Sequence, residues 1–212
     1  MSEHKEYTPR EERLNAFSHW AGVVLFLAGI IPVLKTSAVR RDPLALAGGI
    51  FYCFTLLMMF GCSAVYHTVR SAELKKLTRK LDHCAIYFLI TGSYAPVLYV
   101  SSRDLTGGII FGVLLGLSIL GTVGKFLAGH RFHKIEVGLY IIMGWCAVFI
   151  AGKVIRQLPP SSLWLLLGGG IAYTSGVAAY LSRREFSHAV WHIFVLAGAI
   201  LQFFAITAAL NL

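Results

Sequence analysis

The chain has 212 residues, of which 57% are hydrophobic and only 14% are charged, and its mean hydropathy of +0.69 is far above that of a soluble domain. This composition excludes a soluble globular enzyme, a disordered chain and a small disulfide-stapled scaffold. Apolar runs recur along the chain, and each is long enough to cross the roughly 30 Å hydrocarbon core of a bilayer as a helix. The sequence therefore predicts an integral membrane protein.

The net charge of +9 comes from 19 Lys and Arg residues against 10 Asp and Glu residues. Such an excess could indicate a nucleic-acid partner, but the basic residues lie in short segments between the apolar runs, where membrane topology places them. We therefore expect membrane lipids as partners and no nucleic acid. The four cysteines all fall inside apolar spans without a CxxC or CxxH pairing, so we interpret them as small buried hydrophobic residues.

The predicted fold is an all-α integral membrane protein, a bundle of seven transmembrane helices. The runs are continuously apolar and lack the alternation of barrel strands. In chain order the expected spans are 15–34, 44–66, 83–100, 106–124, 137–155, 163–181 and 189–210. The fifth is the weakest, because Lys153 interrupts it near its end. Residues 15–212 then form one transmembrane domain, and residues 1–14 form a short polar segment without the pattern of a cleavable signal peptide, so we expect the first span to be retained.

The distribution of basic residues predicts the orientation of the bundle. The segment before the first span and those after the second, fourth and sixth spans share one side of the membrane, and they hold 13 of the 19 Lys and Arg residues. By the positive-inside rule this side is cytoplasmic, which places the N-terminus in the cytoplasm and the C-terminus outside. The densest basic segment, from Arg70 to Lys80, is expected to anchor the protein against anionic headgroups.

Polar side chains that are costly in an apolar span lie at the ends of several predicted helices. Ser63 and His67 end the second span, and Asp82 comes at the start of the third. His188 and His192 come at the start of the seventh. Under the predicted topology all these ends lie on the cytoplasmic side. Because the Ser-His and His-His pairs are each spaced i,i+4, their members share a helical face, and both pairs can point at one locus.

This arrangement predicts a metal site, with zinc as the cofactor. Two imidazoles one turn apart, here His188 and His192, are a common pair of ligands from one helix, and His67 is the natural third ligand. Three protein ligands leave a position for water, whose pKa zinc lowers to about 7. Asp82 is the candidate to hold or deprotonate that water, and Ser63 to orient it or to stabilise an oxyanion. The alternative for each histidine alone is a headgroup-level or packing residue.

One face of the first span carries a second polar group. Glu12, Asn15 and His19 are spaced i, i+3 and i+7, and they either cap the helix start or orient the metal ligands. His83 directly follows Asp82 and so points about 100° away from it on a helix. We therefore expect His83 at the membrane interface rather than in the site.

Four strings in chain order carry a resemblance to a known family. They are Glu12 to His19 (ERLNAFSH), Ser63 to His67 (SAVYH), Leu81-Asp82, and His188 to His192 (HAVWH). They resemble the three motif regions of the hemolysin III family, which belongs with the progestin and adipoQ receptors and is more distantly similar to the alkaline ceramidases. The resemblance extends from about Glu12 to the last span, and the order of the motifs on helices one, two, three and seven makes it specific.

The resemblance implies a seven-helix bundle with a zinc ion near the cytoplasmic side. Its ligands would be His67, His188 and His192. Asp82 would lie near the metal-bound water, with Ser63 beside it. The expected location is the inner (plasma) membrane of a bacterium.

Three classes of function remain open. The first is a zinc-dependent hydrolase that acts on an amide or ester of a lipid through zinc-bound water. The second is a pore-forming or cytolytic protein, as the family name implies, although the outer halves of the spans hold few polar groups for a water-filled path. The third is a receptor-like or structural zinc protein without turnover, whose closed site would need a fourth ligand, with Cys62 and Cys84 the nearest cysteines.

Overall fold

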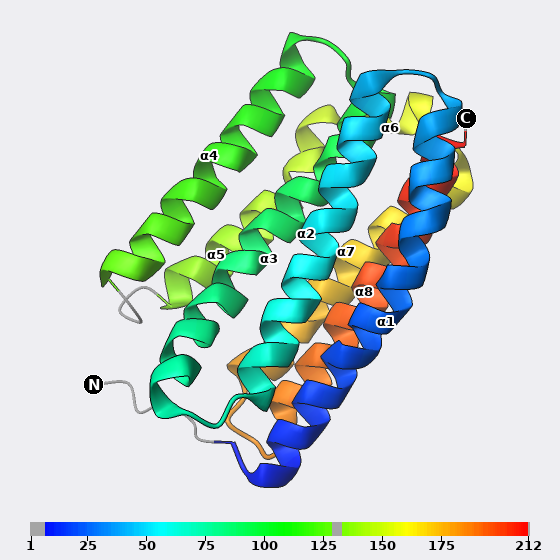
Figure 1. Ribbon diagram of the computed structural model, residues 1–212. Coiled ribbons are helices and arrows are strands. Elements are labelled where there is room, and N and C mark those ends of the chain that lie inside the picture. Colours follow the sequence, from blue (N-terminus) through cyan, green and yellow to red (C-terminus); the bar gives the residue numbers. More distant parts are fainter. Residues whose placement is uncertain (1–6, 129–132, 212) are drawn as a thin grey trace.

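The computed structural model describes residues 7–128 and 133–211, and within these ranges it contains helices and no strands (Figure 1). The elements are α1 (Pro9–Val39), α2 (Pro43–Thr68), α3 (Ala72–Ser101), α4 (Leu105–Ala128), α5 (His133–Gly144), the 3-10 helix η1 (Cys146–Ile150), α6 (Ala151–Gln157), α7 (Pro160–Leu181) and α8 (Ser187–Leu210). Seven helical segments of the described chain are long and apolar enough to cross a membrane, the fifth being Ile135–Gln157. Each predicted span lies inside one of them, so the seven-helix fold class is confirmed.

Capping residues explain why the first two helices begin where they do. The side chain of Thr8 accepts a hydrogen bond from the Glu11 backbone (3.2 Å), and the Glu11 carboxylate accepts one from the Thr8 backbone (2.8 Å). This capping box, with Pro9 in the first turn, starts α1 well before the predicted span. Asp42 caps α2 in a similar way, by accepting from the Leu44 backbone at 2.8 Å.

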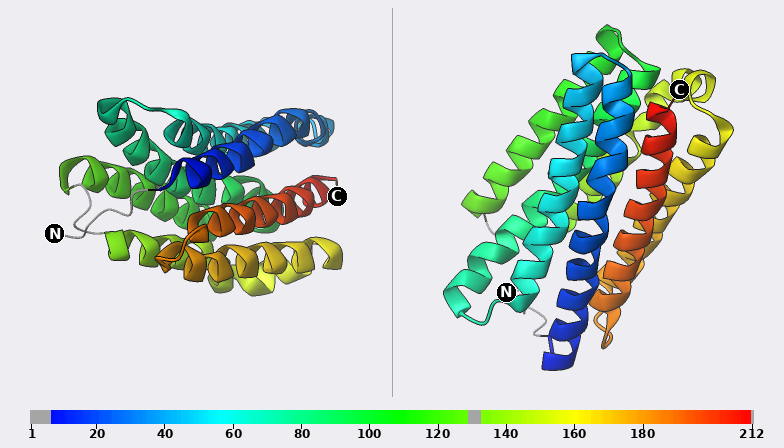
Figure 2. Two further views of the ribbon diagram at one scale, coloured as in Figure 1. Left: turned by 90° about the horizontal axis from the view of Figure 1, so that it is seen from below. Right: turned by 45° about the vertical axis from the view of Figure 1, so that its right-hand side comes forward.

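The third span is longer than its apolar run. α3 begins at Ala72, so most of the basic segment from Arg70 to Lys80 forms its first turns. α3 is also the most buried of the seven spans, because it packs against α2, α4, α5, α6 and α8. α1 packs against α2 and α8, and α7 packs against α8, whereas α4 lies at the edge of the bundle and contacts mainly α3 (Figures 1 and 2).

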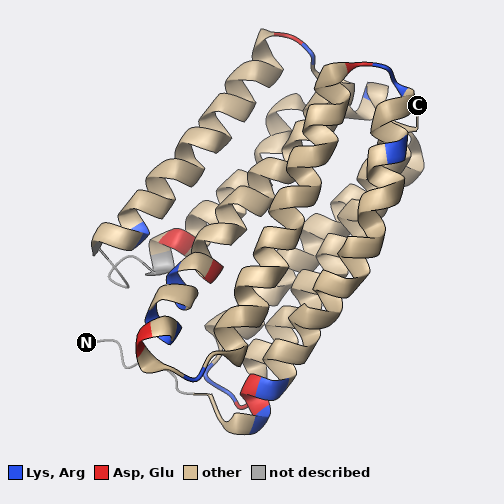
Figure 3. Ribbon diagram, in the orientation of Figure 1, with Lys and Arg blue, Asp and Glu red and all other residues tan. Residues whose placement is uncertain are grey.

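Most charged residues lie at the two ends of the bundle (Figure 3). α1 begins at one end, which we call the proximal end, and α8 finishes at the other (Figure 1). The end of α2 and the starts of α3 and α8 also lie at the proximal end, as the sequence analysis requires for the predicted site. That this end faces the cytoplasm remains a prediction from the basic residues.

The fifth span is interrupted near its middle. α5 ends at Gly144, and the chain passes through η1 before it continues as α6. The buried Tyr94 hydroxyl on α3 donates to the Gly144 carbonyl (2.8 Å) and accepts from the Ala147 amide (2.8 Å). Backbone groups freed inside a bilayer need such internal partners, because no water reaches them there. Lys153, the residue that made this span the weakest by sequence, lies farther along on α6 and pairs with Asp104.

We expect Tyr94→Phe to lower the free energy of unfolding by about 1–3 kcal/mol, because it leaves the Gly144 carbonyl and the Ala147 amide without their partner. Tyr52→Phe is the matched control, since Tyr52 is as deeply buried and its hydroxyl has no hydrogen-bond partner in the described part of the chain. That variant should be neutral or slightly stabilising. Denaturant unfolding of both variants in detergent micelles measures the difference, and equal losses would contradict the role of Tyr94.

Candidate metal centre

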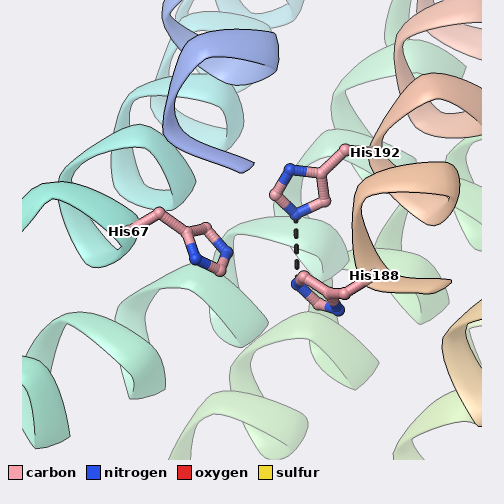
Figure 4. A group of neighbouring side chains, drawn as sticks. All are labelled: His67, His188 and His192. Atoms are coloured by element: carbon pink, nitrogen blue, oxygen red, sulfur yellow. Dashed lines mark hydrogen bonds between the residues drawn. The ribbon is translucent and has the colours of Figure 1, made fainter. Parts of the chain in front are cut away.

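Three histidines from two helices meet at the proximal end (Figure 4). His67 lies in the last turn of α2, and His188 and His192 lie in the first turns of α8. Each can offer one ring nitrogen such that the three nitrogens lie within 4.8 Å of one another, and all three side chains are buried. The Nε2 atoms of His188 and His192 are 3.1 Å apart. The structure thus brings together the three predicted ligands.

A carboxylate and a lysine hold the ring of His67. Its Nδ1 lies 2.5 Å from Glu12 Oε2, and the other carboxylate oxygen of Glu12 accepts a hydrogen bond from Lys75 Nζ at 2.6 Å. The Nε2 atom of His67 is buried and has no hydrogen-bond partner among the described residues. A histidine whose one nitrogen is held by a carboxylate while the other is available has the arrangement of a metal ligand.

The ring of His192 is oriented in a comparable way. Its Nδ1 lies 3.1 Å from the Ser18 hydroxyl and 3.2 Å from the Asn15 carbonyl, both on α1. The imidazole of His19 stacks on it, with ring centroids 3.7 Å apart and planes inclined by 20°. Of the two interpretations of the polar face of α1, the geometry favours orientation of the histidines over helix capping, because Thr8 already caps this helix.

Several polar atoms around the histidines lack partners. Both amide atoms of Asn15 and both ring nitrogens of His19 are buried without a hydrogen bond to any described residue. Buried polar groups are rarely left unpaired, so such atoms mark a place suited to a bound ion and its waters. Three neutral imidazoles are a donor set that zinc and similar divalent ions favour. The residues present therefore fit the metal that the family resemblance implies.

Tyr7 covers the histidines and was missed by sequence reasoning, because it lies in the short polar segment before α1. Its ring centroid is 4.8 Å from that of His188 and 5.8 Å from that of His67. Burial, together with the nearby carboxylates of Asp82 and Glu12, raises the pKa of the Tyr7 hydroxyl. The ring thus stays neutral and closes the site from the proximal side.

The two predicted catalytic residues lie at the same end of the bundle. Asp82 is buried in α3, and it makes no hydrogen bond or ion pair with any described residue. Ser63 is buried in α2, one turn before His67. Neither Asp82 nor a cysteine belongs to the triplet of close ligand atoms within the described chain. The closed four-ligand site therefore has no support from the arrangement of Cys62 and Cys84.

His83, which the sequence analysis expects at the membrane interface, is not exposed on the surface of the bundle, and its depth in the membrane stays a prediction. The residue is buried between α3, α4 and α5, where its Nδ1 lies 2.9 Å from Lys125 Nζ. Lys125, which sequence reasoning assigned to the connection after the fourth span, is fully buried in α4 and pairs with Glu136 at 2.7 Å. No pattern in the sequence signals this group, because its members come from three helices and share no spacing.

Comparison with known proteins identifies the family of this chain. A family model described as Haemolysin-III related matches residues 7–203. Hemolysin-3 of Bacillus cereus is 31% identical over 198 residues, which cover 93% of this chain and 90% of that protein. The Hemolysin-3 homolog of Bacillus subtilis (strain 168) is 28% identical over 201 residues, or 94% of each chain. The human monocyte to macrophage differentiation factor is 29% identical over 164 residues, which cover 73% of this chain and 67% of that protein. The chain belongs to the haemolysin-III-related family of seven-helix membrane proteins.

Proposed function

We propose that this protein is a zinc-dependent hydrolase that cleaves an amide or ester bond of a membrane lipid. The observation that carries the proposal is the convergence of His67, His188 and His192, whose ligand nitrogens lie within 4.8 Å of one another. His67, His188 and His192 would hold the zinc ion, which when bound would supply a water of lowered pKa, about 7, as a nucleophile at neutral pH.

An apolar cavity of about 110 Å³ supports a lipid substrate. It lies between α2, α3, α5, α7 and α8, and most of its wall is apolar. Tyr180 connects the cavity to the histidines, because it lines the cavity and its ring centroid is 5.9 Å from that of His188. Its ring also lies 5.2 Å from that of Trp191, another lining residue. A cavity of this kind suits the apolar part of a lipid whose scissile bond lies at the metal.

Asp82 and Ser63 supply the remaining chemistry in the proposed reaction. Asp82 accepts the proton of the attacking water, since its buried carboxylate is not engaged by another described residue. Ser63 donates a hydrogen bond to the oxygen that becomes negative as the carbonyl is attacked. A C–O bond forms, the C–N or C–O bond of the lipid breaks, and the proton passes from Asp82 to the leaving amine or alcohol. The other product is a carboxylic acid.

We further propose that the site faces the cytoplasm. The first turns of α3 combine basic residues with the exposed side chains of Leu74 and Leu77. Such a surface suits the boundary between anionic headgroups and acyl chains. The two Bacillus relatives support the plasma membrane of a bacterium as the location.

The first prediction from this proposal concerns metal content. The detergent-purified protein should carry about one zinc per chain, and His67→Ala, His188→Ala and His192→Ala should each lose it, because two imidazoles alone hold zinc weakly. His130→Ala, in the connection between α4 and α5 and outside the described residues, should keep it. Elemental mass spectrometry measures the ratio. A folded wild-type protein that takes up no zinc when supplied with it would contradict the proposal. The pore-forming alternative would then be tested by leakage from liposomes.

The carboxylate behind His67 should control metal affinity. We expect Glu12→Gln to weaken zinc binding by about 10–100-fold, because the amide cannot replace the charged partner of the His67 ring. Glu73→Gln removes an exposed carboxylate from α3 and serves as the matched control. Competition with a fluorescent chelator gives both affinities, and equal affinities for the two variants would remove Glu12 from the site.

Asp82→Asn should keep zinc and lose hydrolysis. The amide cannot accept the proton from the attacking water, so turnover should fall by about 100-fold or more. Asp104→Asn, at the opposite end of the bundle, should leave turnover unchanged. A panel of N-acyl amides and acyl esters of long-chain lipids, followed by release of the fatty acid, measures the rates. Full turnover in the Asp82 variant would exclude this residue as the base.

A further inference from the structure

A second group of buried ionisable residues includes His83, the residue that follows Asp82, and takes no part in the proposed chemistry. Lys125 Nζ on α4 lies 2.7 Å from Glu136 Oε2 on α5 and 2.9 Å from His83 Nδ1 on α3. His83 Nδ1 is also 3.5 Å from the same Glu136 oxygen. An ammonium group can only donate, so both the carboxylate and Nδ1 of His83 accept from Lys125. The three residues form one group, which we call the lysine cluster.

Placing such a group inside a bilayer-spanning bundle is costly, so it calls for a function. The Lys125 side chain is fully buried and that of Glu136 is 7% exposed. Charged residues in transmembrane helices are rare and tend to mark functional sites. A buried ion pair also contributes little net stability compared with apolar residues of the same shape. Helix packing alone therefore does not account for the cluster.

The cluster holds α3 at the residue next to Asp82. Lys125 bonds the side chain of His83, while the Tyr140 hydroxyl on α5 donates to the His83 main-chain carbonyl at 2.9 Å. α4 thus hydrogen-bonds the side chain of His83, and α5 hydrogen-bonds its backbone. Asp82, directly before it, has no hydrogen bond or ion pair of its own within the described chain. The place of its carboxylate depends on how this turn of α3 is held.

We propose that Lys125, Glu136 and His83 are positioning residues that direct the Asp82 carboxylate toward the metal centre. This inference rests on the proposed function, in which Asp82 acts beside the metal. The cluster works through α3: a shift of this turn by a fraction of the helix pitch moves Asp82 relative to the histidines of α2 and α8. Catalytic groups tolerate such displacement poorly.

A purely structural role for the cluster makes a different prediction, and the chain offers a matched control. Thr91 on α3 and Ser118 on α4 form another buried polar contact between the same two helices, with their hydroxyls 2.8 Å apart. Thr91→Val weakens the attachment of α3 to α4 about two and a half turns away from Asp82. If the cluster only ties helices together, the two contacts should be interchangeable in their effects on the metal centre.

The test uses Co²⁺ as the probe metal in the full-length, detergent-purified protein, and the readout is the pH midpoint of its visible spectrum. Lys125→Met combined with Glu136→Leu replaces the ion pair by apolar residues without changing the net charge, a replacement that folded proteins tolerate. Asp82→Asn should lower the midpoint by about one pH unit, because a nearby carboxylate disfavours the ionisation that alters the spectrum. The pair replacement should lower it in the same direction.

Combining the pair replacement with Asp82→Asn distinguishes a positioning role of the lysine cluster from a purely structural one. In the Asp82→Asn background the pair replacement should cause no further shift, because its effect acts through Asp82. Lys125→Arg, which keeps the charge and the donors, should retain the wild-type midpoint, and so should Thr91→Val. An additive shift in the combined variant, an equal shift in Thr91→Val, or no shift in the pair replacement would each overturn the positioning role alone. Failure of the wild-type protein to bind Co²⁺ or Zn²⁺ would overturn the proposed function and the positioning role together.

Discussion

Every polar group inside a bilayer has to find its partner within the protein, and this constraint shapes the bundle. Where the fifth span breaks, the hydroxyl of Tyr94 takes up both the free carbonyl and the free amide. Where Lys125 enters α4, Glu136 and His83 meet its ammonium. The lysine arrangement adds little net stability over apolar residues of the same shape, whereas the Tyr94 hydroxyl stabilises the fold by pairing with backbone groups that would otherwise be unpaired. The Tyr94 contacts allow the fifth span to break at Gly144, and the Glu136 and His83 contacts allow a lysine to be buried in α4.

The same constraint applies at the metal centre, but there the described residues do not provide a hydrogen-bond partner for every buried polar atom. Glu12 is balanced by Lys75, and the Nδ1 atoms of His67 and His192 are each engaged. The other ring nitrogens of His67 and His192 converge with a nitrogen of His188, and the Nε2 atoms of His188 and His192 are 3.1 Å apart. Nε2 of His67 and both ring nitrogens of His19 have no hydrogen-bond partner among the described residues. Imidazole nitrogens that converge in this way form a site for a metal ion, which accepts their lone pairs.

Sequence patterns predict the parts of this protein that depend on one helix at a time. Hydropathy locates seven spans, because each apolar run has to match the thickness of the bilayer. The i,i+4 spacing places His188 and His192 on one face, and the positions of His67 and Asp82 at span ends bring them to the same end of the bundle. The lysine cluster and the cover formed by Tyr7 depend on which helices become neighbours, and no single-helix pattern carries that information. The start of α3 at Ala72 was also missed, because a polar first turn has no hydropathy signal.

The charges at the proximal end give an independent reason to expect a cation beside the histidines. The Lys125–Glu136 and Lys75–Glu12 pairs are each neutral. Asp82 is buried and makes no ion pair in the described chain, and the half-buried Arg79 lies about one turn before it on α3. A divalent ion on the three histidines would accept the lone pairs of the imidazoles and would add positive charge at the same end of the bundle as this carboxylate, so both features suit the same ion.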